Sequence, residues 1–98
     1  MTIKVDMNNA EFQQHLFALE KTEQVSLIRT LRKISQMSWN DLYIDKGVRW
    51  ELIGNPTKFN HRIYSFRFSQ KYRGLAYRDG EFLRLLTLHS DHDSAYGM

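Results

Sequence analysis

The chain has 98 residues, enough for one hydrophobic core but not for two, so we expect a single domain over residues 1–98. Hydrophobic residues make up 42% and aromatic residues 13% of the sequence, which excludes a disordered chain. The absence of cysteine excludes disulfides and thiolate chemistry, and no apolar run reaches the roughly 20 residues of a membrane helix. We therefore expect a cytoplasmic protein that does not enter the membrane.

The formal net charge is +3 at pH 7, a mild excess that permits an anionic partner without requiring one. The excess is concentrated between Arg62 and Arg84, where arginines and Lys71 outnumber the acids Asp79 and Glu81. Such a segment is typical of a surface that binds nucleic acid, although a solvated surface is the simpler explanation of the charge alone.

The N-terminal half has the pattern of a short strand followed by helices. Alternation over residues 2–6 predicts an edge strand, and helical spacing over residues 10–21 predicts a helix capped by Asn8 or Asn9. His15 falls on the apolar side of this helix, where we expect a partly buried spacer rather than a ligand.

A second helix is predicted to begin after Thr22, which can act as its N-cap, with Glu23 in the first turn. Residues 38–43 end this helix and begin a connection, and alternation over residues 48–53 predicts a half-buried strand with Leu52 on its inner side. The apolar stripe of the second helix, which we expect to face the core, consists of Val25, Leu27, Ile28, Leu31 and Ile34.

The strongest turn signal in the sequence is the pair Asp79-Gly80, which favours a two-residue type I′ hairpin between two strands. That turn would fix the register of the hairpin and place Arg73 opposite Leu86. It would also place Arg73 and Arg84 on the same face of the sheet, the open face that points away from the helices.

The preceding turn decides which face Arg67 occupies. If residues 69–71 form a three-residue loop, Arg67 lies opposite Arg73 on the open face, and Gly74 and Ala76 on the other face make room for the helices. A four-residue loop would bury Arg67, at a cost of roughly several kcal/mol if its charge were unpaired. We therefore expect the three-residue loop.

Two arginines directly opposite each other need an explanation, because like charges in that position destabilise a sheet by roughly a few tenths of a kcal/mol or more. One explanation is an anion between Arg67 and Arg73, since the planar guanidinium suits phosphate oxygens. The other is internal neutralisation by Asp91, Asp93 or Glu51. The residue pattern alone does not choose between them.

The last strand is followed by a tail rich in His, Asp and Tyr, which would leave the sheet beside the open face. His89 and His92 are suited to proton transfer near neutral pH, and Tyr96 can stack on a base or hold a phosphate. Two His and two Asp within residues 89–93 could also suggest a metal site, but the sequence has no second cluster, so we expect neither a metal nor another cofactor. A disordered polar tail is the other alternative.

The order of a strand, two helices and a four-stranded antiparallel run resembles the RelE/ParE-like toxins of bacterial toxin–antitoxin systems. The resemblance covers nearly the whole chain in architecture and the last third of it in motif. It implies an α+β fold in which two N-terminal helices pack on one face of a twisted, mainly antiparallel four- to five-stranded sheet. The motifs that carry it are Tyr64-Ser65-Phe66-Arg67-Phe68-Ser69, Lys71-Tyr72-Arg73, the strand after Gly80, and the closing segment Asp91-His92-Asp93-Ser94-Ala95-Tyr96.

The resemblance implies an mRNA endoribonuclease, in many members active only in the ribosomal A site. The ribose 2′-hydroxyl attacks the adjacent phosphate, cations stabilise the transition state, and an acid protonates the leaving 5′-oxygen. On matched positions Arg67 and Arg73 are the phosphate clamps, and Tyr96 stacks on or orients the substrate. His92 is the first candidate for the acid or base, with His89 second. The further residues expected to contact RNA are Lys58, Arg62, Lys71, Arg84, Asp91 and Asp93.

The implied partners are a cognate antitoxin protein, mRNA and the ribosome, with no small-molecule cofactor. Two departures from the family pattern leave alternatives open. Ser65 stands where many members carry a second basic residue, and the tail has His and Asp where some members have Arg. These changes fit altered chemistry, but also the ParE branch, which inhibits DNA gyrase without the nuclease residues. A third alternative is a non-catalytic module whose basic face binds RNA or an acidic protein.

Overall fold

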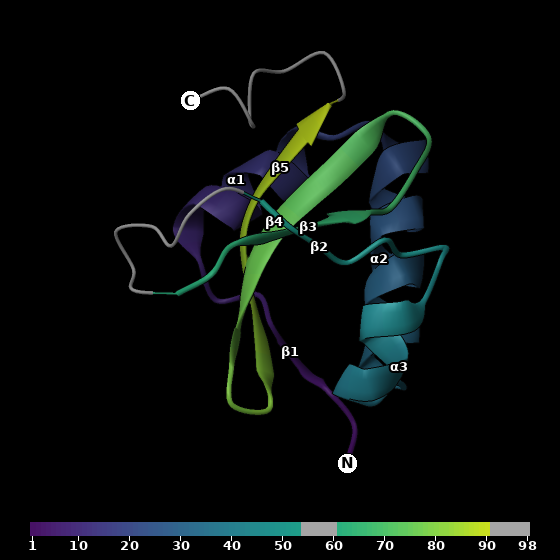
Figure 1. The fold of residues 1–98 in the computed structure, drawn as a ribbon. Helices are drawn as coiled ribbons and strands as arrows, with labels where there is room; N and C mark the ends of the chain where they lie inside the picture. The colour runs from purple at the N-terminus through teal and green to yellow at the C-terminus, as the bar shows by residue number, and fades with distance from the viewer. Residues whose placement is uncertain (54–60, 91–98) are drawn as a thin grey trace.

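The fold is α+β. The computed structural model describes residues 1–53 and 61–90, and in these residues it has three α-helices and one five-stranded, mainly antiparallel sheet (Figure 1). None of the helices in these two ranges is long and apolar enough to cross a membrane.

The first half of the chain forms one short strand and all three helices. Their bounds are β1 Lys4–Asp6, α1 Ala10–Ala18, α2 Lys21–Ser35 and α3 Trp39–Ile44. Asn9 caps α1, because its side-chain oxygen accepts a hydrogen bond from the Phe12 N–H at 3.0 Å, which confirms one of the two predicted caps.

The junction between α1 and α2 differs from the prediction. The first helix ends at Ala18 rather than Lys21, and α2 follows Glu20 rather than Thr22 as its N-cap, without a side-chain capping bond. The side chain of Gln24 instead donates a hydrogen bond to the Leu16 carbonyl at 2.9 Å. The same carbonyl also accepts a hydrogen bond from the N–H of Leu19, the C-cap of α1, at 3.2 Å, so Gln24 adds a side-chain contact between the two helices.

The third helix, α3, differs from the prediction, in which residues 38–43 end the second helix and begin a connection. Ser38 is its N-cap and accepts a hydrogen bond from the Asp41 N–H at 3.2 Å. Asp45 follows the helix, and its carboxylate accepts hydrogen bonds from the Val48 N–H at 2.8 Å and from Lys33 Nζ at 3.3 Å. Asp45 therefore joins the C-terminal half of α2 to the segment that leads into the sheet.

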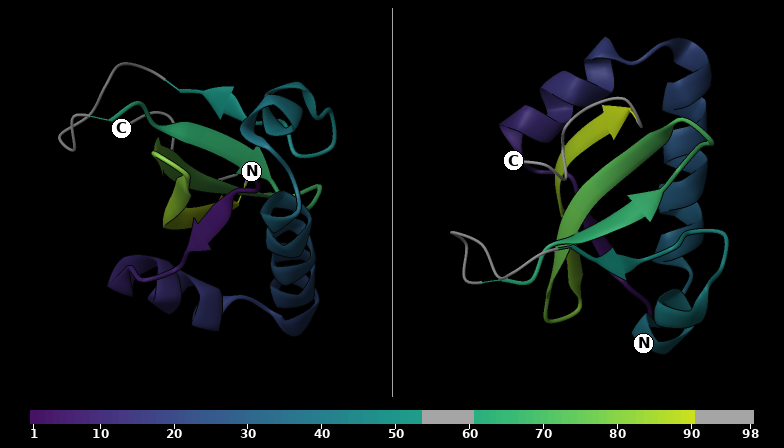
Figure 2. Two further views of the ribbon diagram at one scale, coloured as in Figure 1. Left: turned by 90° about the horizontal axis from the view of Figure 1, so that it is seen from below. Right: turned by 45° about the horizontal axis from the view of Figure 1, so that its top comes forward.

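The sheet has the strand order β1-β5-β4-β3-β2, in which β1 is parallel to β5 and the other neighbours are antiparallel. The remaining strands are β2 Glu51–Leu52, β3 Tyr64–Arg67, β4 Tyr72–Asp79 and β5 Phe82–Ser90. Figure 2 shows that the sheet is strongly twisted and that α1 lies along β5.

The strand β2 is much shorter than the predicted strand over residues 48–53. Arg49 has a left-handed backbone (φ 56°), which interrupts the extended chain before Glu51. Val48 and Trp50 are buried as expected, but Leu52 is 50% exposed, so the predicted inner position of Leu52 is wrong.

The β4–β5 hairpin has a two-residue turn, but its register is not the predicted one. Asp79 pairs with Phe82, so the turn residues are Gly80 and Glu81, and Gly80 carries the positive φ of 62°. A glycine at the first turn position suits a type II′ turn, whereas the predicted turn at Asp79-Gly80 would also have required a left-handed aspartate.

The changed turn moves every pair of the hairpin by two residues and leaves the faces as predicted, because side chains alternate with a period of two. A bulge then adds one more residue to β5: Ala76 pairs with Leu85, whereas Leu75 pairs with Thr87. As a result Arg73 lies opposite His89, and the predicted pairing of Arg73 with Leu86 is wrong.

The core lies between the helices and one side of the sheet, which we call the helix face. Of the predicted stripe on α2, three residues are buried, but Val25 and Ile28 are 46% and 48% exposed. Phe66, Phe68 and Ala76 are buried on the helix face, as expected. The buried residues of the core cluster are Ile3, Phe12, Leu27, Leu31, Ile34, Leu42, Val48, Trp50, Phe66, Phe68, Ala76, Leu83, Leu85 and Leu88.

Gly74 makes room for a side chain of its own sheet rather than for a helix. It pairs with Phe66 across β3 and β4, and a Cβ atom on Gly74 would lie 2.3 Å from Phe66 Cζ. Such a distance is far below van der Waals contact, so the Phe66 ring occupies the space that any larger residue at position 74 would need.

Gly74→Ala is therefore expected to lower the free energy of unfolding by about 1–3 kcal/mol, because the Phe66 ring must move. The smaller side chain of Phe66→Leu should relieve the clash, so the double variant should be more stable than the sum of the single changes by at least about 0.5 kcal/mol in urea unfolding.

Gly80→Ala is the matched control, since a Cβ atom there meets nothing within 4 Å and only the positive φ is penalised. Combined with Phe66→Leu it should give additive effects. Coupling of the same size for both glycines would show that Phe66 and Gly74 have no special contact.

Asp45→Ala tests the contacts at the end of α3. The pKa of Asp45 is lowered, first by the hydrogen bond from the Val48 N–H and further by Lys33, so its stabilising effect is complete above the unfolded pKa of about 3.9. It is lost as the pH falls through the lower pKa of the folded state. We expect the variant to be less stable by about 1–2 kcal/mol at pH 7 and nearly equal to the wild type at the acid end of a urea-unfolding series.

Lys33→Ala serves as the comparison, because it leaves the hydrogen bond from Val48 to Asp45 in place and should therefore cost less. If the difference between Asp45→Ala and the wild type stayed constant down to pH 2, the carboxylate would not be the group responsible.

Candidate nucleic-acid interface

The turn between β3 and β4 positions the candidate phosphate clamps. The Phe68 N–H donates to the Tyr72 carbonyl at 3.4 Å, and the Lys71 N–H donates to Ser69 Oγ at 3.2 Å. Residues 69–71 therefore form the predicted three-residue loop. Arg67 and Arg73 are directly opposite each other, as the sequence predicted.

Three candidate residues lie in one row across three strands. Arg67 on β3 pairs with Arg73 on β4, and Arg73 pairs with His89 on β5. Neighbouring strands are about 4.8 Å apart, so the backbones of the outer two residues are separated by about 10 Å. Because β3 and β4 alternate, these side chains lie on the open face, opposite Phe66 and Gly74. We call this set the Arg67–Arg73–His89 row.

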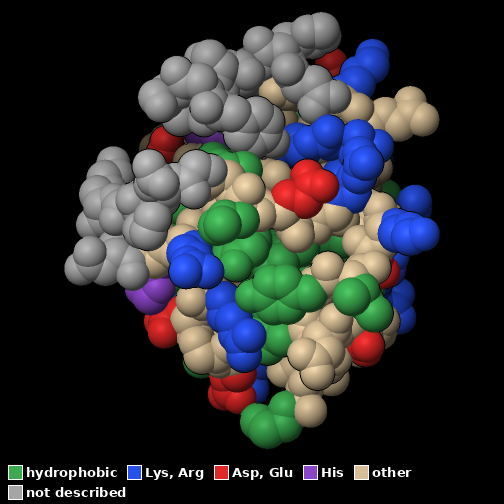
Figure 3. All heavy atoms as spheres, in the orientation of Figure 1, with side chains coloured by type: hydrophobic (Ala, Val, Ile, Leu, Met, Phe, Trp, Pro, Cys, Tyr) green, Lys and Arg blue, Asp and Glu red, His purple; other side chains and the backbone are tan. Residues whose placement is uncertain are grey.

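The neighbouring row on the open face is neutral at its centre. It consists of Ser65, Leu75 and Thr87, next to Glu51 on the edge strand. Ser65 is only 4% exposed, so its hydroxyl is buried in this row. On the side of the molecule seen in Figure 1, hydrophobic side chains occupy the centre and Lys and Arg side chains lie around them (Figure 3).

Arg67 lacks a neutralising partner in the part of the chain that the structure describes. Its Nε atom is buried without a hydrogen-bond partner there, and no carboxylate of those residues, including Glu51, forms an ion pair with it. The predicted neutralisation by Glu51 is therefore not found for Arg67. A half-buried guanidinium without a carboxylate partner suits the binding of an anion at the open face.

His89 is held by contacts on two sides. Its Nε2 is hydrogen-bonded to Thr87 Oγ1 at 2.8 Å, and its ring forms a T-shaped pair with the His15 ring, with the two centroids 5.8 Å apart. Both His89 and Thr87 point to the open face, so the imidazole lies beside Arg73 rather than in the core.

His15 has a structural role that the sequence did not reveal. Its Nδ1 accepts a hydrogen bond from the Leu88 N–H at 3.0 Å, which fixes the neutral tautomer with the proton on Nε2. On this edge β5 is paired with β1 only from Phe82 to Arg84, so the later part of β5 has no strand beside it among the described residues. His15 thus satisfies an edge N–H next to His89, a more specific role than that of the expected spacer.

Arg84 shares the open face but is separated from the row. It lies opposite Tyr77, which is four residues along β4 from Arg73, a distance of about 13 Å. Its Nε donates to Asp79 Oδ2 at 2.8 Å and its Nη1 donates to Asp6 Oδ2, so two carboxylates neutralise it.

The ionic contacts of Arg84 also affect the acids that hold it. The pKa of Asp6 is lowered, chiefly by a hydrogen bond from the Asn8 N–H and further by Arg84. The pKa of Arg84 is raised by its hydrogen bonds to Asp79 and Asp6. These contacts link β1, β5 and the hairpin turn, and indicate a structural role for Arg84. Its RNA contact stays a prediction.

The other predicted contacts divide into three groups. Lys71 is exposed in the loop beside the Arg67–Arg73–His89 row. Arg62 precedes β3 and interacts with the hydroxyl of Tyr64 on the helix face, whose pKa is raised first by burial and then by Tyr43. Predictions that lie outside the described residues concern Lys58, Asp91, His92, Asp93 and Tyr96.

Two residues of this region were not among the candidates, namely His15 and Thr87. The only sequence signal for His15 was a polar residue on the apolar side of a helix. Within residues 1–53 and 61–90, no group of three His, Asp or Glu side chains is placed to hold a metal ion.

The contact between α1 and β5 can be tested with His15→Phe, which keeps an aromatic ring but removes the acceptor. The Leu88 N–H would lose its partner, so we expect faster hydrogen exchange at that amide and a loss of about 1–2 kcal/mol of stability. NMR-detected exchange and urea unfolding measure both effects. Gln14→Phe, at an exposed position of the same helix, is the control. An unchanged exchange rate at Leu88 in His15→Phe would contradict the assignment.

Comparison of the chain with models of known protein families, with curated proteins and with solved structures finds no match. The resemblance to RelE/ParE-like toxins therefore rests on the sequence motifs.

Proposed function

We propose that this protein is the toxin of a toxin–antitoxin pair and an endoribonuclease that cuts mRNA on the ribosome. The observation that carries the proposal is the Arg67–Arg73–His89 row, in which two cationic side chains and one titratable side chain lie on adjacent strands of one face. A protein that only binds RNA needs the cations but has no need of the imidazole.

The two arginines suit the charge that develops during phosphodiester cleavage. When a ribose 2′-hydroxyl attacks the adjacent phosphate, negative charge increases on the phosphoryl oxygens, and guanidinium groups fixed beside them stabilise that charge. Arg67 has no carboxylate partner among the described residues, and the pairing of β3 with β4 holds the two arginines opposite each other before substrate arrives. The repulsion between them is relieved when the phosphate binds.

His89 is the group in this row that can transfer a proton. It can take the proton of the 2′-hydroxyl or deliver one to the leaving 5′-oxygen. Because His89 lies beside Arg73, we consider it as strong a candidate for the acid or base as His92. His92 and Tyr96 remain proposed as a second acid or base and as the residue that stacks on or orients the substrate.

The proposal also includes the RelE-like arrangement of the fold, a cytoplasmic location and a cognate antitoxin. The α+β architecture with a mainly antiparallel sheet supports the first of these. An antitoxin with an acidic segment would suit the open face, since covering Arg67 and Arg73 would block the proposed site directly.

The decisive experiment expresses the wild type and single variants in bacterial cells and maps RNA 5′ ends. The wild type should give cuts in phase with codons. Arg67→Ala and Arg73→Ala should each lower the cleavage rate by about 100-fold or more, because each removes a donor to the phosphate. His89→Ala and His92→Ala should show which imidazole transfers the proton.

Lys21→Ala is the control, because Lys21 is an exposed cation at the start of α2 and does not belong to the row. Its cuts should match those of the wild type. Growth arrest with intact mRNA and gyrase–DNA adducts would replace the nuclease with a gyrase inhibitor. RNA binding by the purified wild type without any cleavage, on or off the ribosome, would reduce the protein to a binding module.

A further inference from the structure

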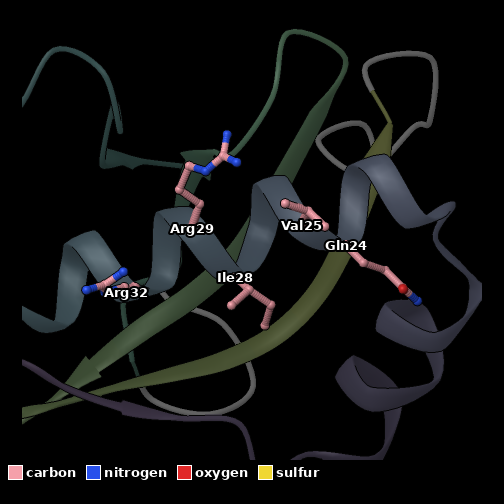
Figure 4. Close-up of a pocket in the computed structure, with 5 residues that line it drawn as sticks. All are labelled: Gln24, Val25, Ile28, Arg29 and Arg32. Atoms are coloured by element: carbon pink, nitrogen blue, oxygen red, sulfur yellow. The ribbon is translucent and has the colours of Figure 1, made fainter.

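The outer surface of α2 carries a shallow groove that is separate from the Arg67–Arg73–His89 row. Its volume is about 370 Å³, and side chains on successive turns of the helix line it (Figure 4). The lining residues are Gln24, Val25, Ile28, Arg29 and Arg32.

The floor of the groove is apolar although it faces outward. Val25 and Ile28 are 46% and 48% exposed, and they lie beside the stripe of α2 that packs into the core. Two β-branched aliphatic side chains at a spacing of three residues form a row along the helix surface. Such rows and the grooves beside them are the surfaces on which a second helix packs.

The two arginines of the groove are not neutralised by the described part of the chain. Arg29 and Arg32 are exposed and form no ion pair there, whereas other surface cations do: Lys33 pairs with Asp45 at 3.3 Å and Lys4 with Glu81 at 3.1 Å. The groove thus combines an apolar floor with an uncompensated positive charge at its side.

We propose that this groove is the docking surface for an acidic, amphipathic helical segment of a partner protein. Its apolar side chains would cover Val25 and Ile28, and its carboxylates would pair with Arg29 and Arg32. From Gln24 to Arg32 the groove extends over about 12 Å, which matches roughly two turns of a helix. The lining has no aromatic side chain on which a base could stack, which favours a protein over single-stranded RNA.

This inference does not depend on the nuclease proposal, because it uses neither the open face nor the tail. It can be tested with the full chain and a fluorescein-labelled synthetic peptide of ~14 residues. This peptide is an alanine helix with leucines and glutamates on one side. Their positions along the helix are spaced by three or four residues. We expect the peptide to bind the wild type saturably in fluorescence anisotropy. Ile28→Ser should weaken this binding at least about tenfold, and so should the double variant Arg29→Glu/Arg32→Glu.

Two matched peptides separate the apolar from the ionic contribution. A peptide with lysine in place of glutamate should bind the Arg29→Glu/Arg32→Glu chain better than the wild type, since the charges are then exchanged. A peptide with serine in place of leucine should bind the wild type at least about tenfold more weakly than the original. Lys21→Glu changes a charge on the same helix outside the groove and should leave the affinity unaltered.

The proposal fails if the groove variants bind the original peptide as tightly as the wild type, or if the serine peptide binds equally well. It also fails if the chain forms a dimer in analytical ultracentrifugation that Ile28→Ser abolishes, because the occupant would then be a second copy. Displacement of the peptide by a single-stranded RNA whose binding needs Arg29 and Arg32 but not Ile28 would assign the surface to nucleic acid. Thermal unfolding of each variant checks that it is folded.

Discussion

The register between β4 and β5 is the constraint on which the rest of the structure depends. These two strands are the longest in the sheet, and β5 also holds β1 on its other side. The positive φ of Gly80 sets the turn, and the bulge between Leu85 and Thr87 changes the alternation once along the hairpin. Without the bulge Arg73 would pair with Leu88, so an apolar residue would lie on the open face and His89 would point toward the core.

The consequences of that register extend to both faces of the sheet. On the helix face it places Leu88 over Gly74, where the Phe66 ring also packs, and so completes the core. On the open face it places the imidazole of His89 beside Arg73. The one extra residue of the bulge in β5 therefore allows both the apolar packing on the helix face and the position of His89 beside Arg73 on the open face.

The arginines of the molecule fall into two electrostatic classes. Arg84 is held by two carboxylates and links strands, whereas Arg67, Arg29 and Arg32 have no carboxylate partner in the described ranges. A neutralised arginine contributes to the fold, while an uncompensated one near apolar surface is available to a ligand. This distinction gives the protein two candidate surfaces on different elements, one on the sheet and one on α2.

The sequence by itself determined the α+β class, the edge strand, a cap at Asn8 or Asn9, the three-residue loop and the pairing of Arg67 with Arg73, because local turn chemistry and alternation specify these features. It placed the end of α1 too late, missed α3 and gave the wrong partners in the β4–β5 hairpin, since short segments and tight turns have several allowed local solutions. It also assigned Val25 and Ile28 to the core, because the spacing of apolar residues along a helix does not show how much of that helix the neighbouring elements cover. Only the tertiary structure decided the bulge that brings His89 to Arg73, the bond from Leu88 to His15 and the neutralisation of Arg84. Each of these depends on contacts between residues far apart in the chain, which no local pattern encodes.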